Sequence, residues 1–585
     1  MGSTTHAGTI QIPEAAGSLA HSSVADVDRA IEEVAANRGA WIRTTVASRI
    51  ALIDEMLAIL DDVAADWVAA AAQAKGLQPG DPRRGEDWFG GPTALGQQLD
   101  LLRRALVDIE ATGRPALPGK PTLRATTGQV TVPTVPVRAA DRLMFPGLTA
   151  HTHLMPGVSL DAVRQAAIYT ETAGEGGVCA VLGAGNVNSI APTDVMTKLF
   201  NDNLVTVLKM NPVNEYSGTY LEQVLGVLVR RGFLRFVYGG VEVGKRLTTH
   251  PLVTHIHMTG SDKTHDAVVW GVGDEGERNR ANRTPITDKL VTSELGNVTP
   301  AIIVPGPWSK GDLRFQAGHL AGMLTFNGGF NCISTRVMIH HAKWNQRREF
   351  MDAFTHALGE ARPRLAYYPG ARDRWAAMTA AHPSNDQFGV DDGTEGCVPW
   401  TLLRDLDPDQ HDDIAFTTEA FNGVMGEVAI DAPMDIASYL DQAVDFCNDV
   451  LWGTLGATFI VHPRTMRNQD SAAAVERALD RLQYGSIVVN EWAGAGFGFM
   501  STPWGAFPGH PLHDIRSGRG FVHNTLMVED VQKTVFRAPF RSPTGKWGFD
   551  PSHRTLDRLG PAAYQVWGRG RLKGLPAALA AALRG

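Results

Sequence analysis

Cys332 is the residue whose surroundings most suggest covalent chemistry. It lies in FNGGFNCISTRV, residues 326–337, after a Gly-rich turn and before a β-branched run. This order predicts a thiol at the junction between a loop and a strand. Backbone N–H groups of such a turn can surround the sulfur and an oxyanion formed beside it. Because an isolated cysteine is more often a small buried apolar residue, this pattern alone makes Cys332 only a candidate nucleophile.

Other residues with possible metal or redox chemistry lack partners. His151 and His153, and likewise His255 and His257, would share one face of an extended chain, but no third or fourth ligand is recognisable nearby. We therefore interpret these histidines as structural or solvent-facing and predict no metal. The remaining cysteines have no C-x-x-C spacing and are expected to be inert: Cys179, Cys397 and Cys447.

The segment GVGDEG, residues 271–276, matches the dinucleotide fingerprint G-x-G-x-x-G. A phosphate-binding turn of this kind would be followed by a helix of small residues, whereas the charged, Pro-terminated ERNRANRTP follows here. We interpret it as a surface loop.

The elements that must position Cys332 follow an α/β pattern. Apolar residues at three- and four-residue spacing predict helices over residues 24–42, 45–76 and 94–111, with Gly76 as a C-cap. After an extended, Pro-rich stretch, β-branched runs alternate with helical segments, which indicates βαβ units on a largely parallel sheet. Ligands gather at the carboxyl ends of such strands. The runs are residues 178–185, 204–210, 234–240, 253–260, 299–306 and 334–340.

Composition limits the class of protein. At 585 residues, two to four domains are expected. The net charge of -8 gives no support for nucleic-acid binding. Residues 1–20 lack the basic and apolar regions of a signal peptide, no run is long enough for a membrane span, and four scattered cysteines suit a reducing compartment. We expect a cytoplasmic protein.

Six motifs in one order resemble the aldehyde dehydrogenase superfamily over roughly residues 25–540. They are the Cys332 segment with Asn327 and Gly329, SELGN at residues 293–297, LGAGNVNSIAP at 182–192, LVTVLKMNP at 204–212, HMTGS at 257–261 and TEAFNGV at 418–424. The resemblance implies an aldehyde dehydrogenase-like fold, with a Rossmann-type cofactor domain, an α/β catalytic domain and a small β oligomerisation extension.

The resemblance also implies the site residues. Cys332 corresponds to the nucleophile, Glu294 to the general base and Asn186 to the oxyanion donor. The cofactor-binding positions are Lys209, Gly240, Gly244, Gly260, Ser261, Leu295, Glu419 and Phe421.

The implied reaction oxidises an aldehyde to a carboxylic acid. The Cys332 thiolate attacks the aldehyde carbon, and the Asn186 amide and the Cys332 backbone N–H stabilise the oxyanion. The thiohemiacetal loses hydride to the nicotinamide of NAD or NADP and leaves a thioester. Glu294 then activates the water that hydrolyses it.

Three departures from the family pattern bear on the cofactor. Asn297 replaces the second Gly of the Glu signature, and Asn422-Gly423 replaces Gly-Pro after Phe421. Pro212 stands where a carboxylate usually binds the adenine ribose. Because that carboxylate would repel a 2′-phosphate, its absence favours NADP slightly over NAD.

Two other functions are considered. Coenzyme A instead of water could accept the acyl group, or the enzyme could act as an acyl-CoA reductase; Glu294 favours hydrolysis. A non-catalytic scaffold with this fold is disfavoured because the motif residues are retained together.

The domain boundaries are expected as follows. Residues 1–125 and 176–295 form the NAD(P)-binding domain, 296–514 the catalytic domain, 126–175 and 515–545 the oligomerisation segments, and 546–585 a basic tail. Residues 522–540 are predicted to be a helix turning into a strand. The resemblance implies that the strand at 532–540 extends a neighbour's sheet in a homodimer or homotetramer.

The tail and the substrate are less defined. The tail from Arg541 has a net charge of +6 and is interpreted as a solvated or subunit-covering extension. It and the segment near 143–157 lack a family counterpart and could cover an interface or shape the substrate tunnel. The substrate is expected to be an apolar or aromatic aldehyde, from four aromatic residues near the expected tunnel mouth: Trp492, Phe497, Phe499 and Trp504.

Overall fold

The structure is a computed structural model, and it describes residues 19–170, 175–389, 396–544 and 548–585. The prediction that residues 1–20 are not a signal peptide falls almost wholly outside these ranges. Within them, no helix combines the length and the apolar character that crossing a bilayer requires. Their strands form two large sheets and a two-stranded ribbon.

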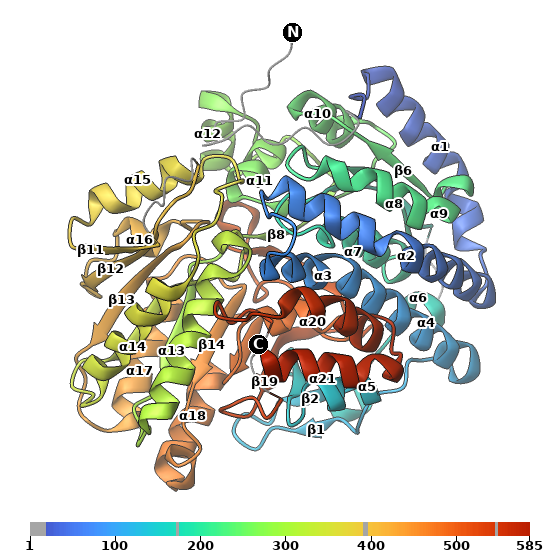
Figure 1. Cartoon of the computed structure of the whole chain (residues 1–585). Coiled ribbons are helices and arrows are strands. Elements are labelled where there is room, and N and C mark those ends of the chain that lie inside the picture. The colour runs from blue at the N-terminus through green and yellow to red at the C-terminus, as the bar shows by residue number, and fades with distance from the viewer. Residues whose placement is uncertain (1–18, 171–174, 390–395, 545–547) are drawn as a thin grey trace.

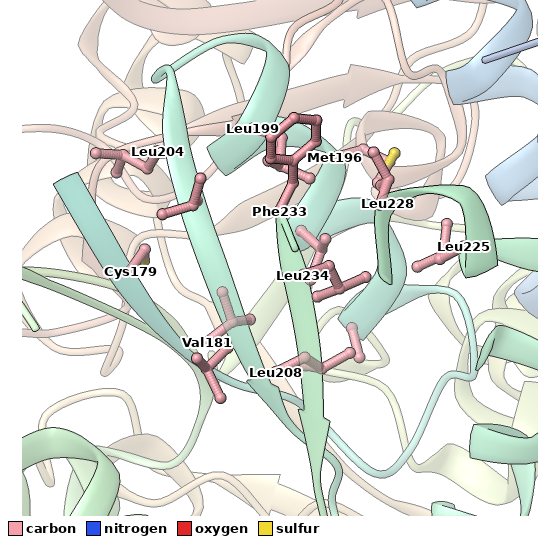
Figure 2. Close-up of a cluster of buried hydrophobic side chains, with 14 of the residues drawn as sticks. Cys179, Val181, Met196, Leu199, Leu204, Leu208, Leu225, Leu228, Phe233 and Leu234 are labelled. Atoms are coloured by element: carbon pink, nitrogen blue, oxygen red, sulfur yellow. The ribbon is translucent and has the colours of Figure 1, made fainter. Parts of the chain in front are cut away.

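The first sheet has five parallel strands and one antiparallel edge strand. In spatial order they are β17 (Gly518–Arg519), β8 (Leu290–Leu295), β7 (His255–Gly260), β4 (Gly177–Leu182), β5 (Leu204–Lys209) and β6 (Leu234–Val237). The β-branched runs are strands because their side chains are buried on both faces of the sheet. Figure 2 shows this packing, with Cys179 and Val181 of β4 beside Leu208 of β5 and Leu234 of β6.

The helices predicted near the N-terminus are confirmed as α1 (Val24–Ile42), α2 (Val46–Ala74) and α4 (Ala94–Thr112). Helix α1 packs on this sheet together with α7 (Ile190–Phe200), α9 (Gly226–Arg230) and α10 (Val241–Thr249). Helices α2 and α4 pack on each other and on α7, α8 (Gly218–Val224) and α9. Gly76 has a φ of +71°, the left-handed conformation that glycine adopts most easily after a helix.

The second sheet has eleven strands. In spatial order they are β1 (Thr122–Leu123), β2 (Val130–Val135), β3 (Thr149–Leu154), β19 (Val531–Arg537), β15 (Ser486–Val489), β14 (Gly456–Ile460), β9 (Thr299–Ile303), β10 (Thr335–His341), β13 (Val424–Ile430), β12 (Trp400–Leu406) and β11 (Asn385–Phe388).

Helices pack on both faces of the central strands. On β9, Ala301 and Ile303 join the core with one pair of helices, while Ile302 joins the core with the other pair. This alternation follows from the two-residue period of a strand. The first pair is α13 (Lys310–Thr325) and α14 (Arg347–Glu360), and the second is α17 (Ile436–Asp449) and α18 (Gln469–Arg481). The α/β fold class is thereby confirmed.

Two local predictions are wrong. Residues 522–540 hold no helix: β18 (Val522–His523) is followed by turns and then β19, with Asn524 and Met527 at positive φ. Residues 271–276 are not a surface loop, because exposed helix α12 (Gly273–Asn282) begins within them and follows helix α11 (Asp262–Val269) rather than a strand. A Cβ on Gly276 would lie 2.4 Å from the Gly271 carbonyl oxygen, so these glycines permit a close backbone contact.

Strand β19 does not offer an edge to a neighbour, which corrects a further prediction. It pairs in parallel with β15, with Ser486 opposite Thr534, and antiparallel with β3, with Ala150 opposite Phe536. Both of its hydrogen-bonding edges are therefore used within one chain.

The C-terminal tail is not a solvated extension. Helix α20 (Leu556–Ala563) packs on α3 (Glu86–Trp88), and α21 (Leu575–Arg584) packs on α20. The segment Tyr564–Gly568 between them packs on α4 and α5 (Ala139–Met144), so the red tail lies beside the blue N-terminal helices (Figure 1). Asp61 of α2 fixes the tail, because it accepts hydrogen bonds from Tyr564, Arg569 and Arg571 at 2.6–2.8 Å.

Candidate active site

Cys332 is half-buried at the junction between a turn and β10, where the sequence places it. Helix α13 ends at Thr325, and Asn327, Gly328 and Gly329 then take positive φ values of 54°, 71° and 77°. Gly329 is required here, since a Cβ would lie 2.4 Å from the Asn422 carbonyl oxygen. The Asn422 that departs from the family pattern is therefore a backbone contact of the nucleophile's turn.

Glu294 is the penultimate residue of strand β8 and faces Cys332. The Cys332 Sγ lies 3.9 Å from the Glu294 Oε1. Burial, with the charge of nearby Asp194, raises the pKa of Glu294 to about 8, and burial with the charges of Glu294 and Glu419 raises the pKa of the Cys332 thiol well above its usual value. Two acids this close cannot both ionise cheaply, so one proton is readily held by the pair.

Asn186 follows β4 and reaches the same turn. Its Nδ2 donates to the Phe330 carbonyl oxygen at 2.9 Å, which leaves the second amide N–H for another acceptor. The Asn186 carbonyl oxygen accepts from Asn327 Nδ2 at 3.0 Å and from the Tyr367 hydroxyl at 3.1 Å. Tyr367, which belongs to none of the six motifs, therefore fixes the backbone of Asn186.

A buried ionic network holds the turn from the N-terminal helices. Lys75 Nζ donates to Asp87 Oδ1 at 2.5 Å and to Asn327 Oδ1 at 2.9 Å. Glu86 Oε2 accepts from the Asn327 backbone N–H at 3.2 Å and from Arg364 Nη1 at 2.7 Å. Sequence reasoning identified Asn327 but missed its four charged partners, Lys75, Glu86, Asp87 and Arg364. For example, Lys75 and Asn327 are 252 positions apart and belong to no shared motif.

Candidate cofactor residues lie at the carboxyl ends of the parallel strands. Lys209 ends β5, Gly260 ends β7 and Leu295 ends β8. Gly240 precedes α10, and Ser261 caps α11 by accepting from the Thr264 backbone N–H. Open space surrounds Gly240 and Gly260, so these two helix N-termini have room for a phosphate group.

Lys209 is half-buried and has a weak internal contact, a 3.4 Å approach of Nζ to the Met210 carbonyl oxygen. Burial lowers its pKa to about 8, and the charge of Glu215 acts in the opposite direction. Gly244 of α10 faces the Lys209 side chain: a Cβ on Gly244 would lie 3.5 Å from the Cδ and Cε atoms of Lys209. Glu215 is thus a carboxylate near Lys209, although Pro212 replaces the carboxylate that the family pattern usually has at that position.

Glu419 packs against the backbone after Glu294. A Cβ on Gly296 would lie 1.9 Å from Glu419 Oε2, and burial raises the pKa of Glu419 to about 7. Its buried Oε1 has no partner among the described residues. Phe421 has a φ of 45° and packs on Tyr368 with ring centroids 4.9 Å apart. The carboxylate oxygen of Glu419 could accept a hydrogen bond from a ribose hydroxyl, and the open helix N-termini after Gly240 and Gly260 could bind a pyrophosphate. Together they suit a nicotinamide dinucleotide.

Asn297 does not place its side chain beside these groups. It is buried, and its Nδ2 donates to Thr299 Oγ1 at 3.0 Å and to the Gly456 carbonyl oxygen at 2.8 Å. This departure from the family pattern therefore ties β8 to the second sheet.

Asp194 lies behind Glu294 and has no counterpart in the motifs we recognised. It is buried on α7, where its Oδ2 accepts from the Thr259 hydroxyl at 2.9 Å and lies 3.4 Å from His257 Nε2. His257 is thus part of a buried polar cluster. No three His, Cys, Asp or Glu side chains among the described residues are grouped to hold a metal.

A cavity of about 190 Å³ opens beside Cys332. Of the four aromatic residues predicted at the tunnel mouth, Trp492, Phe497 and Phe499 line it. Trp504 lies behind them, with its ring centroid 5.9 Å from that of Phe497.

The sequence of part of the chain matches a known family. Residues 163–366 match the model of the aldehyde dehydrogenase family, and this range contains Asn186, Lys209, Glu294 and Cys332. Aldehyde dehydrogenase LUC3 of Fusarium sp is 28% identical over 185 residues, 32% of this chain and 34% of that protein. The chain spans about a third to a half of the length of the curated relatives it matches.

Solved structures share the fold over most of the chain. Aldehyde dehydrogenase C of Pseudomonas syringae, a mutant in complex with NAD⁺ and octanal, is 18% identical, with 89% of this chain and 90% of that chain covered and a TM-score of 0.57. Glyceraldehyde-3-phosphate dehydrogenase GapN of Methanocaldococcus jannaschii, in complex with NADP, is 13% identical, with 90% and 96% covered and a TM-score of 0.58. At these identities the likeness concerns the fold.

Proposed function

We propose that the chain is an aldehyde dehydrogenase and that it oxidises an aldehyde to a carboxylic acid through a thioester on Cys332; the match of residues 163–366 to that family's model supports this. The observation that carries this proposal is the 3.9 Å approach of Cys332 Sγ to Glu294 Oε1 beside an apolar cavity. A nucleophile and a base within reach of one another are what thioester formation and hydrolysis require.

The first step belongs to Cys332. Its thiolate adds to the aldehyde carbon, a C–S bond forms, and the carbonyl electron pair moves to the oxygen. The free N–H of the Asn186 amide and the Cys332 backbone N–H would stabilise this oxyanion. A bound nicotinamide dinucleotide supplies the hydride acceptor.

In the second half of the reaction, Glu294 acts as the base for hydrolysis of the thioester. Once the aldehyde hydrogen has left with its electron pair, the carbonyl re-forms as a thioester. Glu294 takes a proton from water, the hydroxide adds to the acyl carbon, and the C–S bond breaks to release the carboxylic acid and the thiolate.

We propose that the cofactor is held by Lys209, Gly240, Gly244, Gly260, Ser261, Leu295, Glu419 and Phe421. Pro212 favours NADP, but Glu215 provides a nearby carboxylate that would repel a 2′-phosphate. We therefore propose that both NAD and NADP are used. The ratio of kcat/KM for the two cofactors tests this, and Glu215→Gln should shift it towards NADP.

Hydrolysis and transfer to coenzyme A are distinguished by one experiment. Aldehyde oxidation is followed by reduced-nicotinamide absorbance with and without coenzyme A, and the product is identified as acid or thioester. We expect oxidation and a free acid without coenzyme A, and loss of both in Cys332→Ala. Strict dependence on coenzyme A would show that the acyl group is transferred to coenzyme A and not to water. Unchanged activity in Cys332→Ala would reject the mechanism.

We also propose the domain boundaries expected from the sequence, a homodimer or homotetramer, and a cytoplasmic location. Residues 177–295 build the first sheet, in keeping with an NAD(P)-binding role, and the described residues contain no disulfide, in keeping with a reducing compartment. A homodimer or homotetramer would have to use surfaces other than the edges of β19.

A further inference from the structure

The cavity beside Cys332 reaches the C-terminal tail. Its lining includes Cys332 and Ile333 as well as Ala578, Leu579 and Ala582 of helix α21. Residues almost 250 positions apart therefore border one space.

Much of the cavity lining is apolar. Phe145, Phe499 and Trp567 form a triangle with ring centroids 4.8–5.2 Å apart, and all three line the cavity. An apolar cavity of about 150 Å³ accommodates benzene, so a space of about 190 Å³ can hold a ring or a hydrocarbon chain.

Among the described residues, the charged groups that line the cavity are already paired within the protein. Lys75 pairs with Asp87, Glu86 with Arg364, and Glu491 Oε1 lies 2.9 Å from His319 Nε2. A substrate with a second charge would lose its hydration in the cavity without gaining a counter-ion.

We infer that this site selects neutral aldehydes with a long hydrocarbon chain, and that helix α21 of the C-terminal tail forms the wall against which the end of that chain packs. This inference rests on the proposed aldehyde oxidation and specifies its substrate class. Apolar burial should raise kcat/KM by about fourfold for each added methylene until the cavity is filled.

The first test varies both the substrate and helix α21. Straight-chain aldehydes from propanal to dodecanal are compared with aldehydes of the same length that carry a terminal carboxylate. We expect kcat/KM to rise with length and the carboxylated aldehydes to be poor substrates. Equal values for propanal and decanal, or a preference for the carboxylated series, would overturn the inference while leaving aldehyde oxidation intact.

A matched pair of variants locates the wall. Ala582→Trp places a large side chain in the cavity, whereas Leu583→Trp changes the next residue on the same helix, which is 69% exposed. We expect Ala582→Trp to lower kcat/KM for decanal at least about tenfold with little effect on propanal, and Leu583→Trp to affect neither. Leu579→Ala should move the optimum to longer chains. Equal loss for both aldehydes in Ala582→Trp and an unmoved optimum in Leu579→Ala would contradict the assignment.

A binding measurement separates the inference from the reaction. Decanamide is neutral and unreactive, and acetamide is its short control. The rate of Cys332 alkylation by iodoacetamide should fall with decanamide but not acetamide, and Ala582→Trp should remove this protection while Leu583→Trp keeps it. If no aldehyde is oxidised but the protection holds, only the proposed reaction fails. Absence of protection in the unmodified chain would refute the hydrocarbon site.

Discussion

The Cys332 thiol and the Glu294 carboxyl act as one coupled pair. Glu294 is buried and Cys332 is half-buried, and their Oε1 and Sγ atoms lie 3.9 Å apart. The charge of Glu294 raises the pKa of the Cys332 thiol, whereas the hydrogen bond from Cys332 lowers the pKa of Glu294, so the two groups titrate as a pair. A thiol in this setting is protected from nonspecific reaction at neutral pH, and Glu294 can hold the proton that Cys332 must lose. This arrangement predicts a site that becomes more active as the pH rises.

The pH dependence gives a test of this pair. Glu294 must be ionised to act as a base, and its pKa is raised to about 8, so hydrolytic turnover should rise as the pH passes through about 8. Asp194→Asn removes a nearby negative charge, which lowers the pKa of Glu294 and moves the rise to lower pH. Asp54→Asn, at the exposed Arg103–Asp54 ion pair, removes a negative charge elsewhere on the molecule; it is the control and should leave the profile unchanged. A rise that stays in place in Asp194→Asn would exclude Asp194 from the electrostatics of the base.

Residues within short motifs could be predicted from the sequence, whereas their supporting partners could not. Cys332, Glu294 and Asn186 each lie in a segment whose local order identifies them, and the structure brings them to one turn. Asp194 and Lys75 act through contacts made only in the folded chain, and nothing in their local sequence distinguishes them from surface charges.

Among the elements around the site, the end of helix α2 and helix α3 hold the turn that carries Cys332. They do so through a buried ion pair between Lys75, directly after α2, and Asp87 of α3. Lys75 and Asp87 are 6% and 3% exposed, and Lys75 also donates to Asn327 in the turn. Breaking such a pair leaves a buried charge without a partner.

We predict that Lys75→Met lowers the free energy of unfolding by about 3 kcal/mol and also lowers kcat. Adding Asp87→Leu should recover part of the stability, since the unpaired charge is then gone. The exposed pair Arg103–Asp54 is the control, and Arg103→Met should cost less than about 1 kcal/mol in urea unfolding. Equal costs for the two single variants would refute the role of the buried pair.

Elements with continuous apolar patterns were predictable, and elements fixed by tertiary contacts were not. The six β-branched runs are strands because burial on both faces favours them. In residues 522–530 the apolar spacing suggested a helix, yet His523, Asn524, Met527 and Asp530 all have positive φ. In α12 only Gly276 is buried, so no apolar stripe revealed that helix.

At the scale of the whole molecule, β19 joins the N-terminal strands to the catalytic sheet within one chain. Strand β19, which the resemblance predicted to extend a neighbour's sheet, continues the sheet beyond β15 together with β2 and β3. Their pairing is a property of the tertiary fold, which no strand pattern specifies.

Hydrogen exchange tests this intramolecular pairing. Peptides that contain β19 should exchange slowly to the same extent at every protein concentration, because their hydrogen bonds lie within one chain. Light scattering on the same samples reports the mass, and peptides from α20 provide an internal reference. Protection of β19 that falls on dilution together with the mass would show that the strand pairs between chains.

Trapping the thioester would show whether Cys332 carries the acyl group during aldehyde oxidation. Glu294→Gln should form the thioester but hydrolyse it slowly, because the base for hydrolysis is absent while the thiol remains and, without the charge of Glu294, ionises at lower pH. After incubation with decanal and NAD or NADP, mass spectrometry of the peptide with Cys332 should show the added decanoyl group, and hydroxylamine should remove it. An unmodified Cys332, or an acyl group on a different residue, would contradict the account.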